Sequence, residues 1–410
     1  MFDVLIIGGG AAGLSTAIML KKLRNNLKIA IIEQLDRVGK KISVTGNGRC
    51  NITNKEITPA NYYSGNINKA VNILEDFNLS KTKDFFSSIG VEICFENNKG
   101  FPRSFQASSV VDALRFSAAK LGIQIFISTK VEKITKKNDI FFLTTDNNNF
   151  SKDFFKASAV VIATGGLAGG SKLGSNGDGY KFLQSFGHEI KAQSPIIVQV
   201  KTDNTLTKSL KGIKVNAFVS VFKNSKSIAT EYGEVLFCDY GLSGPPILQL
   251  SRYCTKSTTI VLDLFNEHTL KDLTNLIIKR RKIFNGQPLT EFFAGLLHKR
   301  VGQSVLKDLN ITLSKTCETL TEYECKKIAE KLKFFEFKVI GNTGFVNAQA
   351  TSGGADLKDF NATLMSKKCD GLFAAGEVLD VDGDCGGYNL QWAWSSSSII
   401  SNSIVSFLEK

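Results

Sequence analysis

The sequence predicts an α/β fold whose parallel sheet is interrupted by a β-rich region in the middle of the chain. The first observation is an N-terminal β-branched run, glycine loop, helical pattern and second apolar run, together the pattern of a βαβ unit. The second is the return of apolar runs at Ala159–Ala163 and Gly371–Ala375, each followed by glycine, as in strands buried on both faces. The third is a change after about residue 190 to alternating apolar and polar residues, which favours an antiparallel sheet or a small barrel.

The overall composition is that of a globular protein. Of the 410 residues, 43% are hydrophobic and 22% are charged, which excludes a disordered, collagenous or coiled-coil chain. The chain has 51 Lys and Arg against 38 Asp and Glu, a net charge of +13. Such an excess suits an anionic partner such as nucleic acid, a nucleotide or an acidic surface. The chain is also rich in Lys, Asn and Ile, so a biased genome composition is an alternative explanation for much of the excess.

We expect no membrane span, no metal site and a cytoplasmic location. Val4–Leu20 is almost entirely apolar, but Asp3 precedes it and glycines interrupt it, so we interpret it as a strand, a turn and a helix. No other stretch approaches 18 apolar residues. The eight cysteines form neither a C-x-x-C pair nor a zinc spacing, which indicates reduced thiols of a cytosolic protein.

The N-terminal βαβ unit is the clearest element of the chain. Val4–Ile7 suits a parallel strand buried on both faces. Gly8–Gly13 forms the loop, and Leu14–Leu23 has the spacing of a helix whose last turn is basic. Ile29–Ile32 predicts the second strand, which ends at Glu33.

Further elements follow in the first half of the chain. Val110–Leu121 predicts an amphipathic helix, and Gln124–Ile134 and Ile140–Thr145 predict strands. Ala159–Ala163 predicts another buried strand, followed by the glycine-rich stretch Gly165–Gly179.

The middle and the end of the chain have different patterns. Three segments alternate or resemble strands: Val215–Phe222, Glu234–Cys238 and Thr259–Leu264. From Leu270 to Phe335 the pattern becomes helical, as in Glu291–Leu309 and Glu322–Phe335. Gly371–Ala375 then predicts a strand, followed by the loop Gly376–Gly387 and an apolar C-terminal helix.

The first loop has the spacing Gly8-x-Gly10-x-x-Gly13 between a strand and a helix. Gly8 allows a tight turn, Gly10 lets the backbone approach a pyrophosphate, and Gly13 lets the helix pack close to the strand. Glu33 ends the next strand, where an acid accepts hydrogen bonds from a ribose 2′-hydroxyl. The pattern therefore predicts a dinucleotide site at the helix N-terminus and disfavours a 2′-phosphate.

Three later segments favour FAD over NAD as the dinucleotide. Ala163-Thr164-Gly165-Gly166 follows a buried strand, and Gly376-Glu377 follows the last strand. Gly386–Gln391 opens the final helix, whose N-terminus can stabilise negative charge on a reduced flavin ring. Each segment alone is a common glycine turn, so it is their order along the chain that favours FAD.

Several long motifs resemble those of one bacterial flavoprotein family. They are Gly46–Asn54 (GNGRCNITN), Gly241–Pro245 (GLSGP), Gly376–Gly383 and Gly387–Ser395. The chain resembles, from residue 2 to about 405, the BaiN-like NAD(P)/FAD-dependent oxidoreductases, also called aminoacetone oxidase family FAD-binding enzymes. One departure is Cys238-Asp239, where many relatives have Thr-His; if the family histidine acts on substrate, this chain lacks it.

The resemblance implies a two-dinucleotide-binding-domain flavoprotein fold. A Rossmann-like FAD-binding domain would comprise residues 1–190 and 345–410. Residues 191–344 would form an inserted β-barrel-like domain with a helical insert at about 268–335. FAD would be bound non-covalently. Because no second glycine-rich βαβ unit is present, NAD(P)H would dock transiently as the reductant.

The motifs and the resemblance together supply the candidate site. The expected cofactor-binding residues are Gly8, Gly10, Ala11, Ala12, Gly13, Glu33, Gln34, Lys41, Gly48, Arg49, Cys50, Asn51, Val131, Thr164, Gly165, Gly166, Gly376, Glu377, Gly387, Tyr388, Asn389, Leu390 and Gln391. The candidates for catalysis are Arg49, Cys50 and Cys385, each with a structural role as the alternative. The three histidines, His188, His268 and His298, lie outside the cofactor motifs and are expected to be structural.

Three functions remain open on the sequence. The first is an FAD-dependent oxidoreductase that passes hydride to an electron-poor C=C or C=O of a small metabolite. The second is a flavin-dependent enzyme that reduces a base in structured RNA, for instance uridine to dihydrouridine. Residues 201–340 hold 22 Lys and Arg against 14 Asp and Glu, with runs at Lys279–Lys282, Lys299-Arg300 and Lys326-Lys327. The third is a non-catalytic FAD-bound assembly or RNA-binding factor.

Overall fold

The computed structural model describes residues 1–147, 149–150, 154–203 and 206–409. The chain divides into two compact units: unit 1 comprises Met1–Pro195 and Phe345–Lys410, and unit 2 comprises Ile196–Gly344. The sequence placed the first boundary at residue 190, within the strand that here ends unit 1. Among the described residues, no helix combines the length and the apolar character that a bilayer crossing requires.

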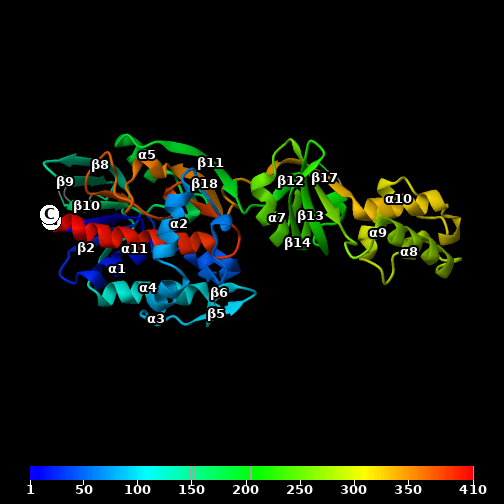
Figure 1. Cartoon of the computed structure of the whole chain (residues 1–410), viewed down its shortest axis with the longest axis horizontal. Helices are drawn as coiled ribbons and strands as arrows, with labels where there is room; N and C mark the ends of the chain where they lie inside the picture. The colour runs from blue at the N-terminus through cyan, green and yellow to red at the C-terminus, as the bar shows by residue number, and fades with distance from the viewer. Residues whose placement is uncertain (148, 151–153, 204–205, 410) are drawn as a thin grey trace. The chain divides into compact units, whose positions relative to one another are not determined.

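The centre of unit 1 is a parallel sheet (Figure 1). Its parallel strands, in spatial order, are β19 (Leu372–Ala374), β10 (Lys156–Ile162), β1 (Phe2–Ile7), β2 (Ile29–Ile32) and β7 (Gln124–Phe126). Most of their residues are fully buried, which explains why these strands are unbroken apolar runs rather than alternating ones. The predicted parallel sheet, with strands from both ends of the chain, is therefore confirmed.

A ribbon of two antiparallel strands, β9 (Ile140–Thr145) and β8 (Val131–Lys137), continues from β10. Here one prediction was wrong: Gln124–Ile134 is not one strand. The chain turns at Ser128, whose φ is 48°, and its N–H donates to the carbonyl of Leu35 at 2.8 Å. Alternation of residue types does not reveal this break, because the turn is stabilised by backbone groups at the end of β2.

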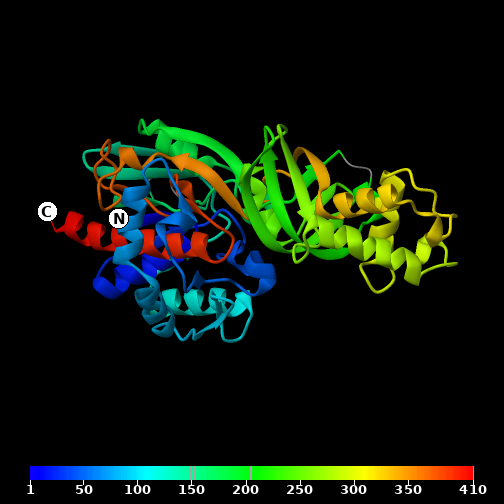
Figure 2. The same cartoon turned by 45° about the vertical axis from the view of Figure 1, so that its right-hand side comes forward.

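Helices cover the sheet. They are α1 (Ala11–Leu23), α2 (Ile67–Asp76), α3 (Leu79–Ser87), α4 (Ala107–Lys120), α5 (Asp178–Ser185) and α11 (Tyr388–Leu408). The first and last helices, α1 and α11, lie side by side (Figure 1 and Figure 2). Ser15 and Ser397 meet between them at 2.9 Å, and such small residues let the two backbones approach closely. This contact joins the C-terminal helix to the helix that follows the glycine loop.

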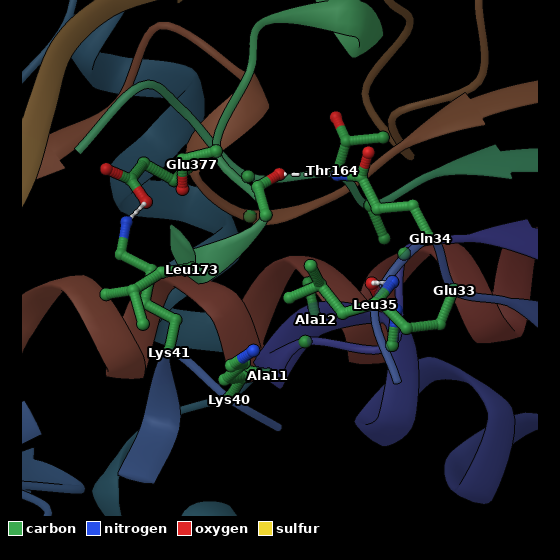
Figure 3. A pocket seen from close by; sticks show the side chains of 18 of the residues that line it. Ala11, Ala12, Glu33, Gln34, Leu35, Lys40, Lys41, Thr164, Leu173 and Glu377 are labelled. Atoms are coloured by element: carbon green, nitrogen blue, oxygen red, sulfur yellow. Dashed lines mark hydrogen bonds and ion pairs between the residues drawn. The ribbon is translucent and has the colours of Figure 1, made fainter. Parts of the chain in front are cut away.

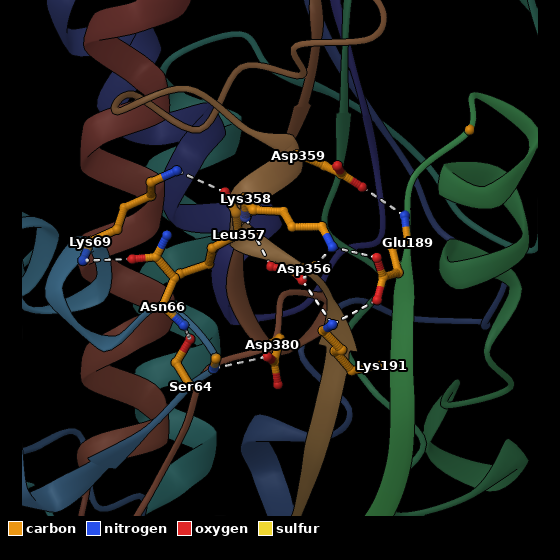
Figure 4. Close-up of polar contacts among 12 residues, drawn as sticks. Ser64, Asn66, Lys69, Glu189, Lys191, Asp356, Leu357, Lys358, Asp359 and Asp380 are labelled. Carbon is orange, nitrogen blue, oxygen red and sulfur yellow. Dashed lines mark hydrogen bonds and ion pairs between the residues drawn. The ribbon is translucent and has the colours of Figure 1, made fainter.

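Smaller sheets complete unit 1. They are β3 (Thr53–Asn54) with β6 (Lys99–Pro102) and β5 (Ile93–Glu96), β4 (Tyr62–Tyr63) with β20 (Asp382–Gly383), and β11 (Ile190–Ile196) with β18 (Ala350–Ala355). A cluster of ion pairs holds the last two strands together (Figure 4). Lys191 contacts Glu189 at 2.6 Å and the buried Asp356 at 3.0 Å, and Lys358 contacts Glu189 at 2.5 Å. Burial alone would raise the pKa of Asp356, but the Lys358 N–H and the Lys191 ammonium outweigh it and lower the pKa.

Unit 2 is a closed antiparallel barrel with a helical insert (Figure 1). The barrel order is β12 (Val200–Thr202), β15 (Gly241–Ser243), β14 (Lys226–Cys238), β13 (Lys214–Lys223), β16 (Thr258–Asp263) and β17 (Phe335–Asn342). Alternate residues such as Val219, Phe237 and Phe337 fill its interior. Short helices α6 (Leu206–Ser209) and α7 (Pro245–Leu250) pack on the barrel. The predicted small barrel is therefore confirmed.

The helical insert contains α8 (Leu270–Ile283), α9 (Lys299–Asp308) and α10 (Glu322–Lys333). The predicted helical run Glu291–Leu309 is wrong in its first part, because a regular helix begins only at Lys299. Before it, Arg280 donates from Nε to the carbonyl of Phe292 at 2.5 Å and also binds the carbonyl of Ala294. These carbonyls bond to a guanidinium rather than within a helix.

Candidate functional site

A cavity opens in unit 1 at the carboxyl ends of β1, β2 and β10, beside the start of α1 (Figure 3). It encloses about 1200 Å³, part of it open to solvent. We call it the unit 1 cavity. Parallel sheets place ligands at this edge of their strands.

More than half of the expected cofactor-binding residues line the unit 1 cavity. They are Gly8, Gly10, Ala11, Ala12, Glu33, Gln34, Lys41, Val131, Thr164, Gly165, Gly376, Glu377, Asn389 and Leu390. The remaining expected residues lie outside its wall: Gly13, Gly48, Arg49, Cys50, Asn51, Gly166, Gly387, Tyr388 and Gln391. The structure thus divides the expected residues into those that line this cavity and those that do not.

The glycines of the first loop have different roles. At Gly13 a Cβ would lie 1.9 Å from the Gly8 carbonyl oxygen, so this glycine is needed for packing. Gly8 has a φ of 105°, and its Cβ would lie 2.5 Å from the Ala163 oxygen. At Gly10, by contrast, nothing lies within 4 Å of the Cβ position. Gly10 is the N-cap of α1, so the free N–H groups of the first helical turn face this open space.

Glu33 fixes this loop as well as facing the cavity. Its two carboxylate oxygens accept hydrogen bonds from the N–H groups of Gly9 and Leu35, both at 2.8 Å. Burial raises the pKa of the Glu33 carboxyl. Each oxygen keeps a further lone pair, so a ribose hydroxyl can still donate to it.

A partly buried ion pair lies on another part of the wall. Lys41 Nζ lies 2.5 Å from Glu377 Oε2, drawn as a dashed contact in Figure 3. Glu377 Oε1 accepts from the Thr351 N–H at 2.8 Å, which fixes the carboxylate. The charge of Glu377 is thereby balanced on the wall, so the carboxylate does not exclude an anionic ligand.

Residues 173–178, which we call the strap, cross the wall from the end of β10 to the end of β2. Gln34 Nε2 donates to the Gly174 carbonyl at 2.7 Å, and Asn176 Nδ2 donates to Gln34 Oε1 at 2.9 Å. Lys130 and Asp178 form an ion pair at 3.2 Å. Burial would raise the pKa of Asp178, but its hydrogen bonds to Lys181 and Lys130 lower it.

Sequence reasoning missed most of the strap and several basic residues of the wall. The missed residues include Arg37, Lys40, Lys130, Leu173, Gly174, Ser175, Asn176 and Asp178. The available signal for the strap was the glycine-rich stretch Gly165–Gly179, which the sequence marked only as a loop. Nothing in its spacing indicates that it packs against Gln34.

The start of α11 contributes less to the wall than expected. Asn389 and Leu390 line the cavity, but their neighbours point away from it. Tyr388 Oη donates to the Glu56 carbonyl at 3.1 Å, and Gln391 Nε2 donates to the Phe77 carbonyl at 3.0 Å. A Cβ at Gly387 would lie 2.4 Å from the Thr53 oxygen. Tyr388 and Gln391 thus hold α11 on residues 56–77, and Gly387 allows its close approach to Thr53.

Gly166 has a similar packing role. A Cβ there would lie 2.5 Å from Thr351 Oγ1, which accepts the N–H groups of Leu167 and Ala168, each at 2.9 Å. Because residue 166 has no side chain, the Thr351 hydroxyl can approach and bind the loop after β10.

The GNGRC segment lies next to the cavity wall in sequence but is not part of it. Thr45, the residue before the segment, lines the wall, whereas Gly48, Arg49, Cys50 and Asn51 do not. Cys50 is fully buried, and burial raises the pKa of its thiol to about 12. Burial also raises the pKa of the Cys385 thiol. A reactive thiolate is therefore disfavoured at both cysteines.

The histidines lie outside the cavity, as the sequence led us to expect. His188 is buried, with Nε2 at 2.9 Å from Ser366 Oγ, and its burial lowers its pKa. His298 caps α9 by accepting the Arg300 N–H at Nδ1. Within the described ranges no group of His, Cys, Asp and Glu has a metal-binding arrangement.

The unit 1 cavity fits a dinucleotide. The N-terminus of α1 and the open space at Gly10 suit a pyrophosphate, and Glu33 suits a ribose. On the same wall the Thr164 hydroxyl is buried, and no described group forms a hydrogen bond with it. An orphaned hydroxyl of this kind needs a partner, which a bound nucleotide can supply.

Comparison with known proteins identifies relatives along the whole chain. A family described as HI0933-like protein Rossmann domain matches residues 2–403. The 3-dehydro-bile acid delta(4,6)-reductase of Clostridium scindens is 32% identical, covering 95% of this chain and 96% of the relative. The ribosomal RNA dihydrouridine synthase of Haemophilus influenzae is 30% identical, covering 96% of both chains, and that of Escherichia coli is 29% identical, covering 97% and 96%.

Solved structures share the fold at low identity. A flavocytochrome c3 fumarate reductase matches with a TM-score of 0.52 and 15% identity, over all of this chain and 79% of that chain. The FrdA subunit of Escherichia coli quinol fumarate reductase matches with a TM-score of 0.53 and 16% identity, over all of this chain and 70% of that one. Both matches establish the arrangement of the elements.

Proposed function

This chain belongs to the HI0933-like Rossmann family, and on that premise we propose that it is an FAD-dependent oxidoreductase. Its substrate is a small metabolite with a C=C bond conjugated to a carbonyl group. The observation that carries the proposal is the unit 1 cavity, where a helix N-terminus, a ribose acceptor and an orphaned hydroxyl line one wall.

The residues of the wall suit FAD held without a covalent bond. The N–H groups at Ala11 and Ala12 would bind the pyrophosphate, Glu33 the adenosine ribose, and Thr164 a further polar group of the cofactor. The described wall offers no Cys, His or Tyr side chain for covalent attachment. When bound, the flavin supplies the hydride chemistry, and the protein orients the cofactor and excludes competing reactions.

The reductant in this proposal is NAD(P)H, bound transiently. The chain has one glycine-rich βαβ unit, and its cavity accounts for a single dinucleotide. We place the protein in the cytoplasm, because all eight cysteines are free and reduced thiols are typical of that compartment.

The conjugated C=C bond is supported by the bile acid reductase relative, whose substrate name contains a carbonyl and double bonds. Conjugation to a carbonyl makes the far carbon of a C=C bond electron-poor, so hydride adds there and a proton adds at the neighbouring carbon. A hydride and a proton together saturate the bond.

A second candidate function is reduction of a uracil base in structured RNA. Two relatives at 30% and 29% identity are named ribosomal RNA dihydrouridine synthases, and the uracil C5=C6 bond is also conjugated to a carbonyl. The basic excess of residues 201–340 favours this candidate. However, within the run 279–282, Arg280 binds main-chain carbonyls and Arg281 donates to the Leu320 carbonyl, so only the two lysines remain for phosphate.

The test is an anaerobic absorbance titration of the purified protein. We expect flavin bands that bleach on addition of NADH or NADPH. The reduced protein is then mixed separately with a 3-oxo-4-ene steroid acid and with protein-free ribosomal RNA. Reoxidation by the steroid supports the first candidate, and reoxidation by RNA supports the second. A flavin that neither nucleotide bleaches contradicts the proposal and favours a non-catalytic FAD-bound factor.

A further inference from the structure

Arg49 is carried by a loop with an unusual backbone. Gly46, Asn47, Gly48 and Cys50 all have φ between 55° and 81°, the left-handed region. Two of these four are not glycine, and such residues persist in this region only where the surroundings hold them. Such strain is concentrated at functional sites, so the side chain presented by this loop is a candidate for a specific role.

The loop is closed by its own hydrogen bonds. The Arg49 N–H donates to the Gly46 carbonyl at 3.1 Å, and the Cys50 N–H donates to the Thr45 carbonyl at 3.0 Å. Thr45 lines the unit 1 cavity. The loop that carries Arg49 is therefore attached through Cys50 to a residue of the cavity wall, while Arg49 itself is not part of that wall.

The guanidinium of Arg49 rests on an aromatic surface. It lies 4.3 Å from the ring centre of Phe101 and 4.6 Å from that of Phe105. The two ring centres are 5.8 Å apart, so the guanidinium lies close to both rings at once. Phe105 itself has a φ of 52°, a second strained position that serves this contact. Arginine combines such stacking with two-pronged binding of carboxylate or phosphate, and lysine does not.

The guanidinium of Arg49 forms an ion pair with a carboxylate of the same chain. Arg49 Nη2 lies 2.5 Å from Glu96 Oε2, and the two side chains are 40% and 51% exposed. Exposed ion pairs contribute little to stability, so another anion can replace Glu96 without disturbing the fold.

A purely structural role for the pair is redundant. The strands that carry Glu96, Phe101 and the following turn are already attached to this loop by main-chain bonds. The Ile52 N–H donates to the Gly100 carbonyl at 2.7 Å, and the Lys55 N–H donates to the Asn98 carbonyl at 2.8 Å. The Arg49–Glu96 contact is not required to hold these segments together.

We infer that Arg49 binds an anionic group of the substrate, a carboxylate or a phosphate, and that Glu96 occupies this position when no substrate is bound. This inference rests on the proposed function for the identity of the reaction. It adds that the preferred substrates are anions whose charged group lies at the edge of the cavity. Arg49 is a positioning residue here, since it anchors the end of the substrate that does not react.

The test compares matched charged and neutral probes by calorimetric titration of the oxidised protein with its cofactor. The carboxylate probe is a 3-oxo-4-ene steroid acid, with its methyl ester as the neutral partner. The phosphate probe is uridine 5′-monophosphate, with uridine as the neutral partner. The two pairs distinguish a carboxylate from a phosphate as the recognised group.

The variants are Arg49→Gln, Arg49→Lys and Glu96→Gln. We expect Arg49→Gln to weaken binding of the preferred anion at least 10-fold and to change binding of its neutral partner less than twofold. Arg49→Lys should also weaken anion binding, but less than Arg49→Gln does. Lysine keeps the positive charge but lacks the planar guanidinium that binds an anion at two points. Glu96→Gln should strengthen anion binding, because it removes the competing carboxylate.

Arg115 provides a matched control. It pairs with Asp112 at 3.1 Å and lies 4.8 Å from the Phe116 ring, but its helix α4 has no strained residue. Arg115→Gln should leave the binding of every probe unchanged.

Three results would overturn the inference. One is wild-type protein that binds neither anion more tightly than its neutral partner. Another is equal weakening of anion and neutral partner by Arg49→Gln, and the third is weakening of anion binding by Glu96→Gln. These results are independent of turnover, whereas failure of the proposed function would appear as a flavin that NADH and NADPH leave oxidised.

Discussion

The two glycine loops of unit 1 use glycine in opposite ways. The loop that begins at Gly8 ends at Gly10, the N-cap of α1, and leaves the N–H groups of the first helical turn facing open space. The loop 45–50 directs the N–H groups of Arg49 and Cys50 to its own carbonyls. The first loop can therefore bind a ligand with its backbone N–H groups, and the second loop only through the side chain that it presents. A glycine-rich motif alone does not distinguish these cases.

The largest expected effect tests the packing glycine of the first loop. Gly13→Ala places a Cβ 1.9 Å from the Gly8 oxygen, a main-chain atom that cannot move aside. We expect a loss of stability of about 3 kcal/mol, the upper part of the range for overpacking, measured by urea denaturation. Gly10→Ala is the control and should change stability by less than about 1 kcal/mol, since nothing lies within 4 Å of its Cβ position. Equal losses in both variants would contradict the assigned roles.

Gly10→Val tests the binding function of the same loop. The side chain would occupy the space that we assign to the pyrophosphate. We expect at least a 100-fold weaker affinity for FAD, about 2.7 kcal/mol, while the cofactor-free protein keeps its urea midpoint. The measurement is flavin content after dialysis against graded FAD. Full FAD content in the Gly10→Val protein would contradict our assignment of the pyrophosphate to this position.

Lys41→Met tests the Lys41–Glu377 ion pair, which the segment before the second loop forms on the cavity wall. Lys41 balances Glu377 on the wall, and both side chains are at least three-quarters buried. Without the ammonium, the carboxylate is left uncompensated beside an anionic cofactor. We expect about 10-fold weaker FAD binding, or about 1.4 kcal/mol.

The double variant Lys41→Met, Glu377→Gln should recover part of this affinity, because it removes both charges. FAD titration followed by flavin fluorescence measures each variant. No recovery in the double variant would show that Lys41 acts independently of Glu377.

The smallest expected effect concerns Cys50 in the second loop. Its thiol has a pKa near 12 in the fold against an ordinary value of 9.0, because burial disfavours the thiolate. A raised pKa of an acidic group contributes stability that is complete below pH 9 and is lost as the pH rises from 9 toward 12. We expect the urea midpoint to fall across this range.

Cys50→Ser is the matched variant, and it should remove that part of the pH dependence while leaving flavin reduction unchanged. Native Cys50 should also resist thiol reagents at pH 8. Rapid labelling of Cys50 in the folded protein would contradict its burial and reopen a redox role.

Much of the fold could be predicted because buried parallel strands appear in the sequence as continuous apolar runs. Val4–Ile7 and Ile29–Ile32 correspond closely to β1 and β2. The break at Ser128 could not be predicted, since it depends on a hydrogen bond to Leu35, which is 93 positions earlier in the chain. The late start of α9 has a similar cause, because the side chain of Arg280 takes carbonyls that a helix would have used.

The candidate site was predicted unevenly for a related reason. The first glycine loop and Glu33 lie on the cavity wall, since a strand–loop–helix unit has a fixed local geometry. The strap was not recognised, and Arg49 and Cys50 lie off the wall despite their conspicuous motif. A sequence motif indicates a group of functionally or structurally related residues, but it does not show which of them line a cavity. The basic run at residues 279–282 shows the same limit, since its arginines bind main-chain carbonyls.

The sequence by itself determined the local structure: which runs become buried strands, where the first loop turns, and the family to which the chain belongs. These features depend on neighbouring residues, through steric limits and the period of apolar residues. Only the tertiary structure decided which side chains meet across the chain, such as Lys41 with Glu377, separated by 336 positions, and Gln34 with Gly174, separated by 140. Such contacts arise from the packing of whole elements, and no local pattern records them.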